Sequence, residues 1–490
     1  MKHKARIVLL ATVLFLSLMT AAAQAATGVE RAGLLGAGAK NVQTKTLTAG
    51  PVPAVGKMLR VDPTQAQLTI SAWEKNEVSA EATVEVGDSD PEFIKEFLDG
   101  TTLKLEAEAG GLVLRLRSPM NREREDTDLS RRIRDAVRSG HWNLSFAARI
   151  IVRVPASMSL DAGNSFGNVE VGGVTGRLNI RNESGQVRVV GCGGELKLEN
   201  SFAEVRVVDF KGPIDVKNES GDVWAENIGG RADIRNSFQE VRFVKIGGPL
   251  TVTAESAAVI GSDVAGDCRI TSSFQKIDVR GVRGRLEVNA ESSPVTIRDV
   301  DGDAVIRSSF GDVSVTGVGG SLDVQSESAK ITAVDVKKEA TIKTSFEGVE
   351  ARRIGGRLTV EAESSGVLAE DVGGAVSVRS SFSSVVLRRT SGPITVTAES
   401  SSVEIAEIKT LPAGCVIDVQ TSFRPIRITL PAWTEVQGTA KAGFGKVVSD
   451  IPVTLSDPGS LDGQVVSFGA GKGGVTLNLE TSADITIKKQ

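Results

Sequence analysis

The chain has 490 residues, of which 57 are Lys or Arg and 61 are Asp or Glu, so its formal charge is only −4. This near balance excludes a strong electrostatic attraction to nucleic acid or to an anionic membrane surface. Gly is abundant at 52 residues, Tyr is absent, and about half of the 16 Phe recur at one fixed interval, which indicates internal repetition.

The N-terminus has the three parts of a secretory signal peptide. A basic segment over residues 2–6 precedes an apolar segment over residues 7–19, and Ala23-Gln24-Ala25 supplies a small-x-small cleavage site. The apolar segment is shorter than the ~20 residues that a bilayer requires, and an uncleaved anchor is the alternative. We expect residues 1–25 to direct export to the periplasm, the cell surface or the medium, and no transmembrane segment in the mature chain.

From residue 164 onward, a polar-Ser-Phe triplet returns every 36 residues. Its rings are Phe166, Phe202, Phe238, Phe274, Phe310, Phe346 and Phe382, followed by Phe423. Midway between these copies lies a triplet with Glu at its centre and Ser at its end. Its carboxylates are Glu183, Glu219, Glu255, Glu291, Glu327, Glu363 and Glu399. The structural unit is therefore half of that interval, eighteen residues, and two units form one repeat.

Within a unit, apolar residues alternate with polar ones. Val169 and Val171 alternate in one short run and Leu178 and Ile180 in the next, which is the pattern of β-strands with one buried face. Identical residues at a constant interval favour a coil that stacks each unit on the last over an array of antiparallel hairpins. We predict an all-β, single-chain β-solenoid (parallel β-helix), right-handed as parallel β connections usually are.

Gly recurs at every eighteenth position from Gly176, and only Lys338 and Thr410 interrupt this column before residue 411. We expect a corner that requires φ > 0 in every coil, because Gly adopts that conformation without steric cost. A second column begins with Asn164, Asn182 and Asn200, and we expect these amides to form a ladder between coils.

The Phe column has two interpretations. Counting by twos from Leu178 and Ile180 places the Phe position inside, where rings alternating with the Ser of the intervening coils would fill a narrow core. We therefore predict that Phe166, Phe202, Phe238, Phe274, Phe310, Phe346, Phe382 and Phe423 form a buried column. The alternative is an exposed aromatic stripe that stacks on sugar rings.

The Glu residues have the opposite parity and should point outward, ~9.6 Å apart along one edge. A solvated edge is the simpler interpretation, and an edge that binds cations or a basic partner is the alternative.

Segments outside the repeat complete the domain plan. We expect residues 26–50 to form a flexible tether. We expect residues 51–145 to form a β-rich N-terminal cap with short helices near 91–99 and 128–139. We expect residues 146–430 to form the β-solenoid. Residues 431–490 supply the C-terminal closing coils, the last of them over residues 472–488.

Ile150-Ile151-Val152-Arg153-Val154-Pro155, followed by Phe166-Gly167-Asn168-Val169-Glu170-Val171, resembles the bacterial "putative adhesin" β-strand-repeat family, an envelope family of undefined function. The closing run Thr481-Ser482-Ala483-Asp484-Ile485 is similar to that family's last strand, although Ala483-Asp484 stands where Gly is usual. The resemblance covers roughly residues 50–490. It implies a β-solenoid and no defined catalytic residues.

Few residues are suited to catalysis. His141 is the only His outside the signal segment, which leaves little room for His-based chemistry. Asp299, Asp301 and Asp303 resemble a loose calcium loop, but Asp beside Gly302 is ordinary turn chemistry. Cys192 and Cys268 are ~19 Å apart along the coils, too far for a disulfide, so buried thiols are expected there and at Cys415.

We therefore expect a non-catalytic, adhesin-like or structural rod of the cell envelope, with no cofactor, no metal site and no nucleic-acid partner. Its partner would be an envelope protein or a glycan. Two alternatives remain: a carbohydrate-active β-helix enzyme (polysaccharide lyase or hydrolase), and a self-assembling envelope filament.

Overall fold

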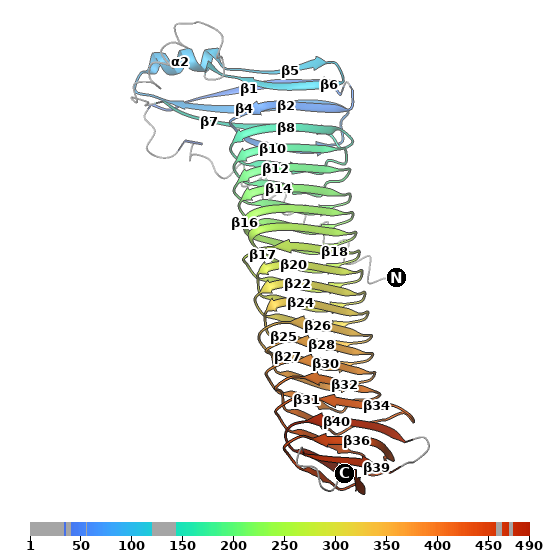
Figure 1. The fold of residues 1–490 in the computed structure, drawn as a ribbon. Coiled ribbons are helices and arrows are strands. Elements are labelled where there is room, and N and C mark those ends of the chain that lie inside the picture. Colours follow the sequence, from blue (N-terminus) through green and yellow to red (C-terminus); the bar gives the residue numbers. More distant parts are fainter. Residues whose placement is uncertain (1–33, 36–40, 55, 120–143, 457–462, 470–473) are drawn as a thin grey trace. The chain divides into compact units, whose positions relative to one another are not determined.

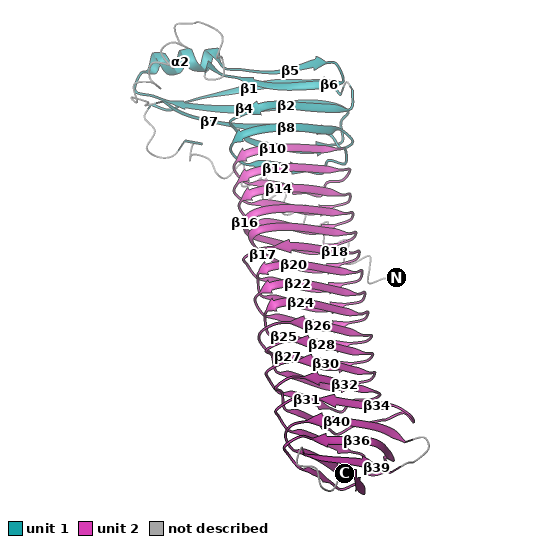
Figure 2. Ribbon diagram, in the orientation of Figure 1, with its two compact units in different colours: residues 1–176 teal, residues 177–490 magenta. Residues whose placement is uncertain are grey.

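The computed structural model describes residues 34–35, 41–54, 56–119, 144–456, 463–469 and 474–490. The signal segment, most of the expected tether, the expected helix at 128–139 and His141 lie outside these ranges. The described chain is nearly all β and contains a parallel β-solenoid of about 14 turns, with coils about 18 residues apart, which confirms the predicted fold class (Figure 1). It divides into two compact units, Met1–Gly176 and Arg177–Gln490 (Figure 2).

Unit 1 combines an antiparallel layer with parallel strand pairs. Strand β4 lies between β1 and β7 with antiparallel pairing to both, and β5 and β6 form a hairpin. Strand β2 pairs in parallel with β6 and β8, and β3 pairs in parallel with β7 and β9. The strands are β1 (Gln43–Pro53), β2 (Met58–Thr64), β3 (Gln67–Trp73), β4 (Glu77–Gly87), β5 (Thr102–Glu108), β6 (Gly111–Arg117), β7 (Ser145–Pro155), β8 (Ser159–Phe166) and β9 (Val169–Gly172).

Two sequence expectations are tested in unit 1. Helix α2 (Pro91–Gly100) forms where it was predicted, and the Asp90 side chain caps it by accepting from the N–H groups of Glu92 and Phe93. Residues 43–50 are not a tether, because they belong to β1 and pair with β4. A polar strand between solvent and a sheet lacks the apolar alternation that would have revealed it.

In unit 2 most coils contribute two strands, and each strand pairs in parallel and in register with its counterpart one coil later (Figure 1). The first strands of the coils are β10 (Leu178–Ser184), β12 (Leu196–Phe202), β14 (Ile214–Ser220), β18 (Cys268–Ser272), β20 (Leu286–Ser292), β22 (Ala304–Phe310), β24 (Leu322–Ser328), β26 (Ala340–Thr344), β28 (Leu358–Ala362), β30 (Val376–Ser380), β32 (Ile394–Ala398) and β34 (Val416–Gln420). The second strands are β11 (Val187–Val190), β13 (Val205–Phe210), β15 (Val223–Ile228), β19 (Ile277–Val282), β21 (Val295–Val300), β23 (Val313–Val318), β25 (Ile331–Val336), β27 (Val349–Ile354), β29 (Val367–Val372), β31 (Val385–Arg388), β33 (Val403–Ala406) and β35 (Ile426–Leu430). In two coils both strands run together as β16 (Ala232–Ile246) and β17 (Leu250–Val264).

The core of unit 2 is built from the alternating Val, Ile, Leu and Ala side chains of these strands, which are almost fully buried. The predicted Asn ladder is confirmed at its edge. Asn182 Nδ2 donates to Asn200 Oδ1 at 3.0 Å, and Asn200 Nδ2 donates to Asn218 Oδ1 at 3.1 Å. All of these Asn are buried, so the ladder satisfies polar atoms that would otherwise be costly inside the coil.

The Gly column has a different cause from the one predicted. Among its members only Gly194 and Gly392 have positive φ, so the expected left-handed corner is not there. A Cβ at Gly212 would instead lie 1.7 Å from the carbonyl oxygen of Gly194 on the preceding coil. Gly is therefore required by the close approach of one coil's backbone to the next.

The left-handed corner lies three residues upstream of that column. Its φ angles fall between 51° and 77° in every coil from Gly191 to Glu407. The residues are Gly191, Asp209, Asn227, Lys245, Asp263, Gly281, Asp299, Gly317, Asp335, Arg353, Asp371, Arg389 and Glu407. Asp, Asn and Gly predominate because they tolerate this conformation best.

The chain does not visit the C-terminal coils in their spatial order. Strands β40 (Val475–Thr481) and β41 (Ile485–Lys489) pair with β34 and β35 on one side and with β36 (Val436–Ala442) and β37 (Val447–Ser449) on the other. Strands β38 (Val453–Leu455) and β39 (Gln464–Phe468) complete this end by antiparallel pairing. The expectation that the segment 472–488 closes the solenoid is therefore wrong, because its described strands, β40 and β41, lie between two other coils.

Candidate functional site

The Phe column lies on the surface. The rings predicted to be buried are all exposed, with exposed fractions between 51% and 70%, so that prediction is wrong. The residues concerned are Phe166, Phe202, Phe238, Phe274, Phe310, Phe346, Phe382 and Phe423. Soluble proteins seldom expose so many aromatic rings in one column. Exposed apolar surface of this extent commonly marks an interaction site.

The chain turns next to Phe202, which is where counting by twos failed. Asn200 points inward, and its Nδ2 donates to the carbonyl oxygens of Phe202 at 3.0 Å and Ala203 at 3.1 Å. Ala203 has φ = 81°, so the chain leaves the extended conformation just after the ring. Phe202 is the last residue of β12, and its ring lies on the outer side of this corner, so alternation counted from the middle of the strand does not hold at its last residue.

Residues on neighbouring coils set the spacing of the rings. Phe202 pairs with Ser184 on the preceding coil and with Ser220 on the next, and Phe238 follows Ser220 in the same column. The rings therefore stand on alternate coils, ~9.6 Å apart, with a small hydroxyl side chain between each pair.

Phe444 extends the column beyond the sequence repeat. Ala442 pairs with Thr481, and the Phe444 N–H donates to the carbonyl oxygen of Ser482 at 2.8 Å. The Ser482 N–H in turn donates to the carbonyl oxygen of Ser422 at 2.9 Å. Phe444 therefore stands two coils beyond Phe423, and it is 89% exposed. The aromatic edge of unit 2 comprises Phe202, Phe238, Phe274, Phe310, Phe346, Phe382, Phe423 and Phe444.

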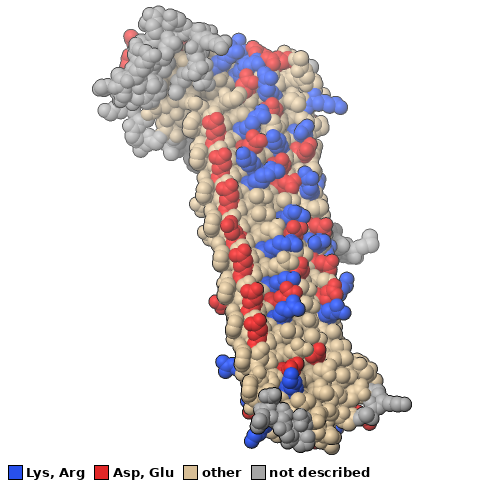
Figure 3. All heavy atoms as spheres, in the orientation of Figure 1, with Lys and Arg blue, Asp and Glu red and all other residues tan. Residues whose placement is uncertain are grey.

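The predicted Glu residues form an acidic column beside the aromatic edge. All seven, from Glu183 to Glu399, are exposed, and Figure 3 shows a line of acidic side chains along unit 2. Each lies one residue upstream of the Ser that separates two rings. Within the described part of the chain none is recorded in an ion pair, whereas many other charges of unit 2 pair between coils, as Arg269 does with Glu287 at 2.7 Å.

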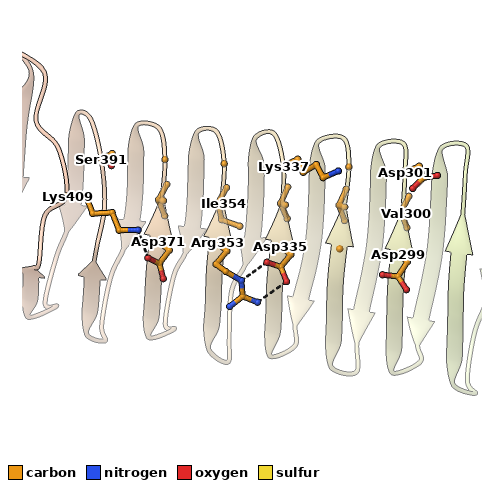
Figure 4. Close-up of a pocket in the computed structure, with 17 residues that line it drawn as sticks. Asp299, Val300, Asp301, Asp335, Lys337, Arg353, Ile354, Asp371, Ser391 and Lys409 are labelled. Carbon is orange, nitrogen blue, oxygen red and sulfur yellow. Dashed lines mark hydrogen bonds and ion pairs between the residues drawn. The ribbon is translucent and has the colours of Figure 1, made fainter.

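A groove of about 940 Å³ runs along another side of unit 2, next to the left-handed corner (Figure 4). One column of its lining residues holds Asp299, Asp335, Arg353 and Asp371. The column two residues further along the chain holds Asp301, Gly319, Lys337, Gly355, Gly373 and Lys409. The Gly residues leave the groove open because they place no side chain in it.

Many of the charged side chains that line the groove form ion pairs. Asp335 accepts from two guanidinium nitrogens of Arg353, one of them at 2.8 Å, and Asp371 accepts from Arg389 at 3.1 Å and from Lys409 Nζ at 2.7 Å. Hydrogen bonding to Arg389, and then to Lys409, lowers the pKa of Asp371 to about 2. The pKa of Asp335 is lowered by Arg353. Both carboxylates are thus held ionised, which makes them poor general acids.

The acidic cluster and the thiols show no reactive arrangement. Asp303 Oδ1 accepts from the Ser321 N–H at 2.8 Å, which is a turn contact between coils. No group of three or more His, Cys, Asp or Glu side chains in the described ranges is placed to hold a metal ion. The three Cys are buried outside any disulfide, and burial raises the pKa of Cys268 to about 12.

Sequence reasoning missed two parts of these sites. Phe444 lies outside the 36-residue interval, although a local signal is present, since Phe444-Gly445-Lys446-Val447 matches Phe166-Gly167-Asn168-Val169. The left-handed corner that lines the groove did carry a signal, since Asp, Asn or Gly occupies most positions of its column, as at Asp209, Asn227 and Asp263.

The fold is that of a β-solenoid, as the resemblance to the "putative adhesin" β-strand-repeat family implied. The chain is similar to a crystal structure described as a putative cell adhesion protein from Clostridium sporogenes ATCC 15579, with 8% identity and a TM-score of 0.14 over 92% of this chain and 100% of that one. No protein-family model and no curated protein sequence matches. A likeness at this TM-score does not identify a shared site. No helix among the described residues is long and apolar enough to cross a membrane.

Proposed function

We propose that the protein is an exported, non-catalytic component of the cell envelope that acts as an adhesin-like rod and binds its partner through the aromatic edge. The observation that carries this proposal is the constant two-coil interval of the exposed rings, which continues at Phe444 across the permuted coils. The order of basic, apolar and small residues at the N-terminus supports export.

The size of the edge supports a binding role. Each ring leaves roughly 100 Å² accessible, so the eight together expose on the order of 800 Å² of aromatic surface. That is about what each partner contributes to a specific protein interface. An inert spacer would gain nothing from this surface, because exposed aromatic rings promote aggregation.

The decisive experiment replaces rings with the residue that the alternate coils already hold. Phe274→Ser, Phe310→Ser and Phe346→Ser together should leave the fold intact and abolish adhesion of the purified protein to cells or to a glycan array. Trp433→Ser is the matched control, because this ring is 62% exposed but lies outside the edge. Undiminished adhesion of the triple variant would refute the proposal.

A polysaccharide lyase or hydrolase is the second candidate, and the groove is the observation that favours it. Among the described residues, Asp299 and Asp301 are the carboxylates of that groove without a close cationic partner, since the nearest recorded contact is Arg280 to Asp299 at 4.0 Å. An assay for new reducing ends or unsaturated uronates on acidic polysaccharides, with Asp301→Asn as the control, tests it directly.

A filament is the third candidate. At the C-terminal end, Val453 and Leu455 of the edge strand β38 are 38% and 47% exposed, and β38 pairs only with β39 among the described strands. An open apolar edge can template pairing with another chain. Light scattering over a range of concentrations would show growing particles if the rods join end to end.

A further inference from the structure

The aromatic edge and the acidic column together define a surface lattice with one period. Each pair of coils offers one ring, as at Phe202, and one carboxylate, as at Glu219. Glu219 precedes Ser220, which pairs with Phe202, so it lies about 6 Å from the ring's position, one step along the strand and one step between strands. A partner that used the whole lattice would repeat an apolar group and a cation every ~9.6 Å.

We propose that this surface binds an extended, basic, proline-rich chain in the polyproline II conformation, with one turn of the ligand for each pair of coils. The inference rests on the proposed function and names its partner by chemistry. A polyproline II helix has three residues per turn and rises about 9.3 Å per turn, so it departs from the lattice by only about 0.3 Å per turn. Over the length of the edge the accumulated error stays at about 2 Å.

Other regular chains fit the lattice less well. A β-strand presents one face every ~6.6 Å, so its side chains and the rings would fall out of step at once. An α-helix returns to the same face after seven residues, or ~10.5 Å, and accumulates about 0.9 Å of error per repeat. The polyproline II helix is the closest match among the three.

The chemistry of the edge agrees with this ligand. Proline rings pack on aromatic side chains, which is how proline-rich segments are commonly recognised. A Lys or Arg on the adjacent ridge of the ligand would reach the acidic column, whose carboxylates have no recorded ion pair among the described residues. Polyproline II backbone makes no internal hydrogen bonds, so its carbonyls can accept from the Ser hydroxyls that lie between the rings from Phe202 to Phe423.

The surface beside Phe238 has room for such a chain. A hollow of about 740 Å³ is lined there by residues that include Phe238, Ser256, Asp222, Glu240 and Arg242. Glu240 pairs with Arg242, whereas the Asp222 side chain accepts, among the described residues, only from the backbone N–H of Glu240, at 3.0 Å. The hollow therefore adds a further carboxylate next to a ring and favours a cationic ligand.

A second copy of this chain would match the period of the lattice but would not neutralise its charge. In such a pair, the residue that follows each ring in the sequence would have to supply the cations that face the acidic column. These residues are Ala203, Gln239, Gln275, Gly311, Glu347, Ser383, Arg424 and Gly445. Only one is basic, so self-association would leave the acidic column without partners.

The test titrates the full-length exported protein with fluorescein-labelled (Pro-Pro-Lys)n peptides of two to seven repeats. We expect affinity to rise with every added repeat, since each occupies another pair of coils, and to fall with salt. (Pro-Pro-Glu)n should not bind, and (Pro-Lys)n, which has period two, should bind at least tenfold more weakly at equal length. Affinity that is independent of n or indifferent to the sign of charge overturns the inference.

Variants locate the binding surface. Glu219→Gln, Glu255→Gln and Glu291→Gln together, and separately Phe238→Ser, Phe274→Ser and Phe310→Ser together, should each weaken (Pro-Pro-Lys)n binding roughly tenfold or more. Glu339→Gln and Trp433→Ser, which change exposed residues elsewhere, should not. Equal losses in these controls would overturn the inference.

The same variants separate this inference from the proposed function. If the Phe variants lose adhesion to cells while no peptide binds at any length, the adhesin-like role stands and the polyproline II partner is refuted. Binding of a glycan in place of the peptides, or dimers that the Phe variants abolish, would refute it as well.

Discussion

Phe444 stands in the same column as Phe423, two coils away, although the coil between them is formed by the last strands of the chain. The alternation of a ring and a small residue thus survives a change in the order in which the chain visits its coils. Strand pairing between coils, and not a fixed interval in the sequence, places Phe444 in this column. We therefore interpret the aromatic edge as a feature of the assembled surface.

Truncating an edge ring should cost little stability. Phe274→Ala removes a ring that is 59% exposed, so we expect the free energy of unfolding to fall by less than about 1 kcal/mol. Phe243→Ala is the matched control, because Phe243 is 0% exposed and its loss should cost about 3–5 kcal/mol. Urea denaturation of both variants makes the comparison, and equal losses would mean that the Phe274 ring is buried after all.

The Asn ladder should be more sensitive to substitution. Asn218 accepts from Asn200 at 3.1 Å and donates to the carbonyl oxygen of Gly221 at 2.9 Å. Asn218→Ala leaves these buried groups without partners and should cost about 1–3 kcal/mol. Asn218→Ser should cost less, since Ser272 occupies the equivalent position and donates to the Ala257 carbonyl oxygen at 3.3 Å. A neutral Ala variant in thermal denaturation would contradict the ladder's role.

Asp371 should link stability to pH. Its pKa is about 2 in the folded protein and ~3.9 in an unfolded chain, so the folded state favours the ionised form. The resulting stabilisation is fully present above pH ~4 and is lost as the pH falls through about 2. Asp371→Asn should therefore lower Tm at pH 7, with the difference disappearing near pH 2.

The control for that measurement is Asp299→Asn. Asp299 occupies the same corner, but its recorded ion pair, to Arg280, is 4.0 Å long. Its substitution should produce a smaller Tm change at pH 7. A difference for Asp371→Asn that persists unchanged at pH 2 would show that the ion pairs are not its cause.

The left-handed corner and the Gly column should respond differently when Gly is introduced or removed. Lys245 has φ = 57°, a conformation that costs a non-Gly residue roughly 1–2 kcal/mol, so Lys245→Gly should stabilise or be neutral. Gly212→Ala should destabilise strongly, because the added Cβ would lie 1.7 Å from the Gly194 oxygen. Thermal melts of both variants test the assignment, which a tolerated Gly212→Ala would contradict.

The repeat by itself determined the fold. A constant interval of eighteen positions and alternation such as Leu178 and Ile180 specify short strands stacked in register, and they identify the buried Val, Ile and Leu. The Asn ladder also followed, because identical residues one coil apart must be neighbours. These features depend only on local extended geometry and on the length of one turn.

Tertiary structure alone decided what faces the partner. Alternation holds along the middle of β12 but fails at its last residue, Phe202, next to the corner at Ala203, so the direction of the ring depends on a corner that no apolar period encodes. The place of Phe444 depends on which strands pair, and pairing between distant segments is fixed by the assembled core. The aromatic edge therefore became visible only once the coils were stacked.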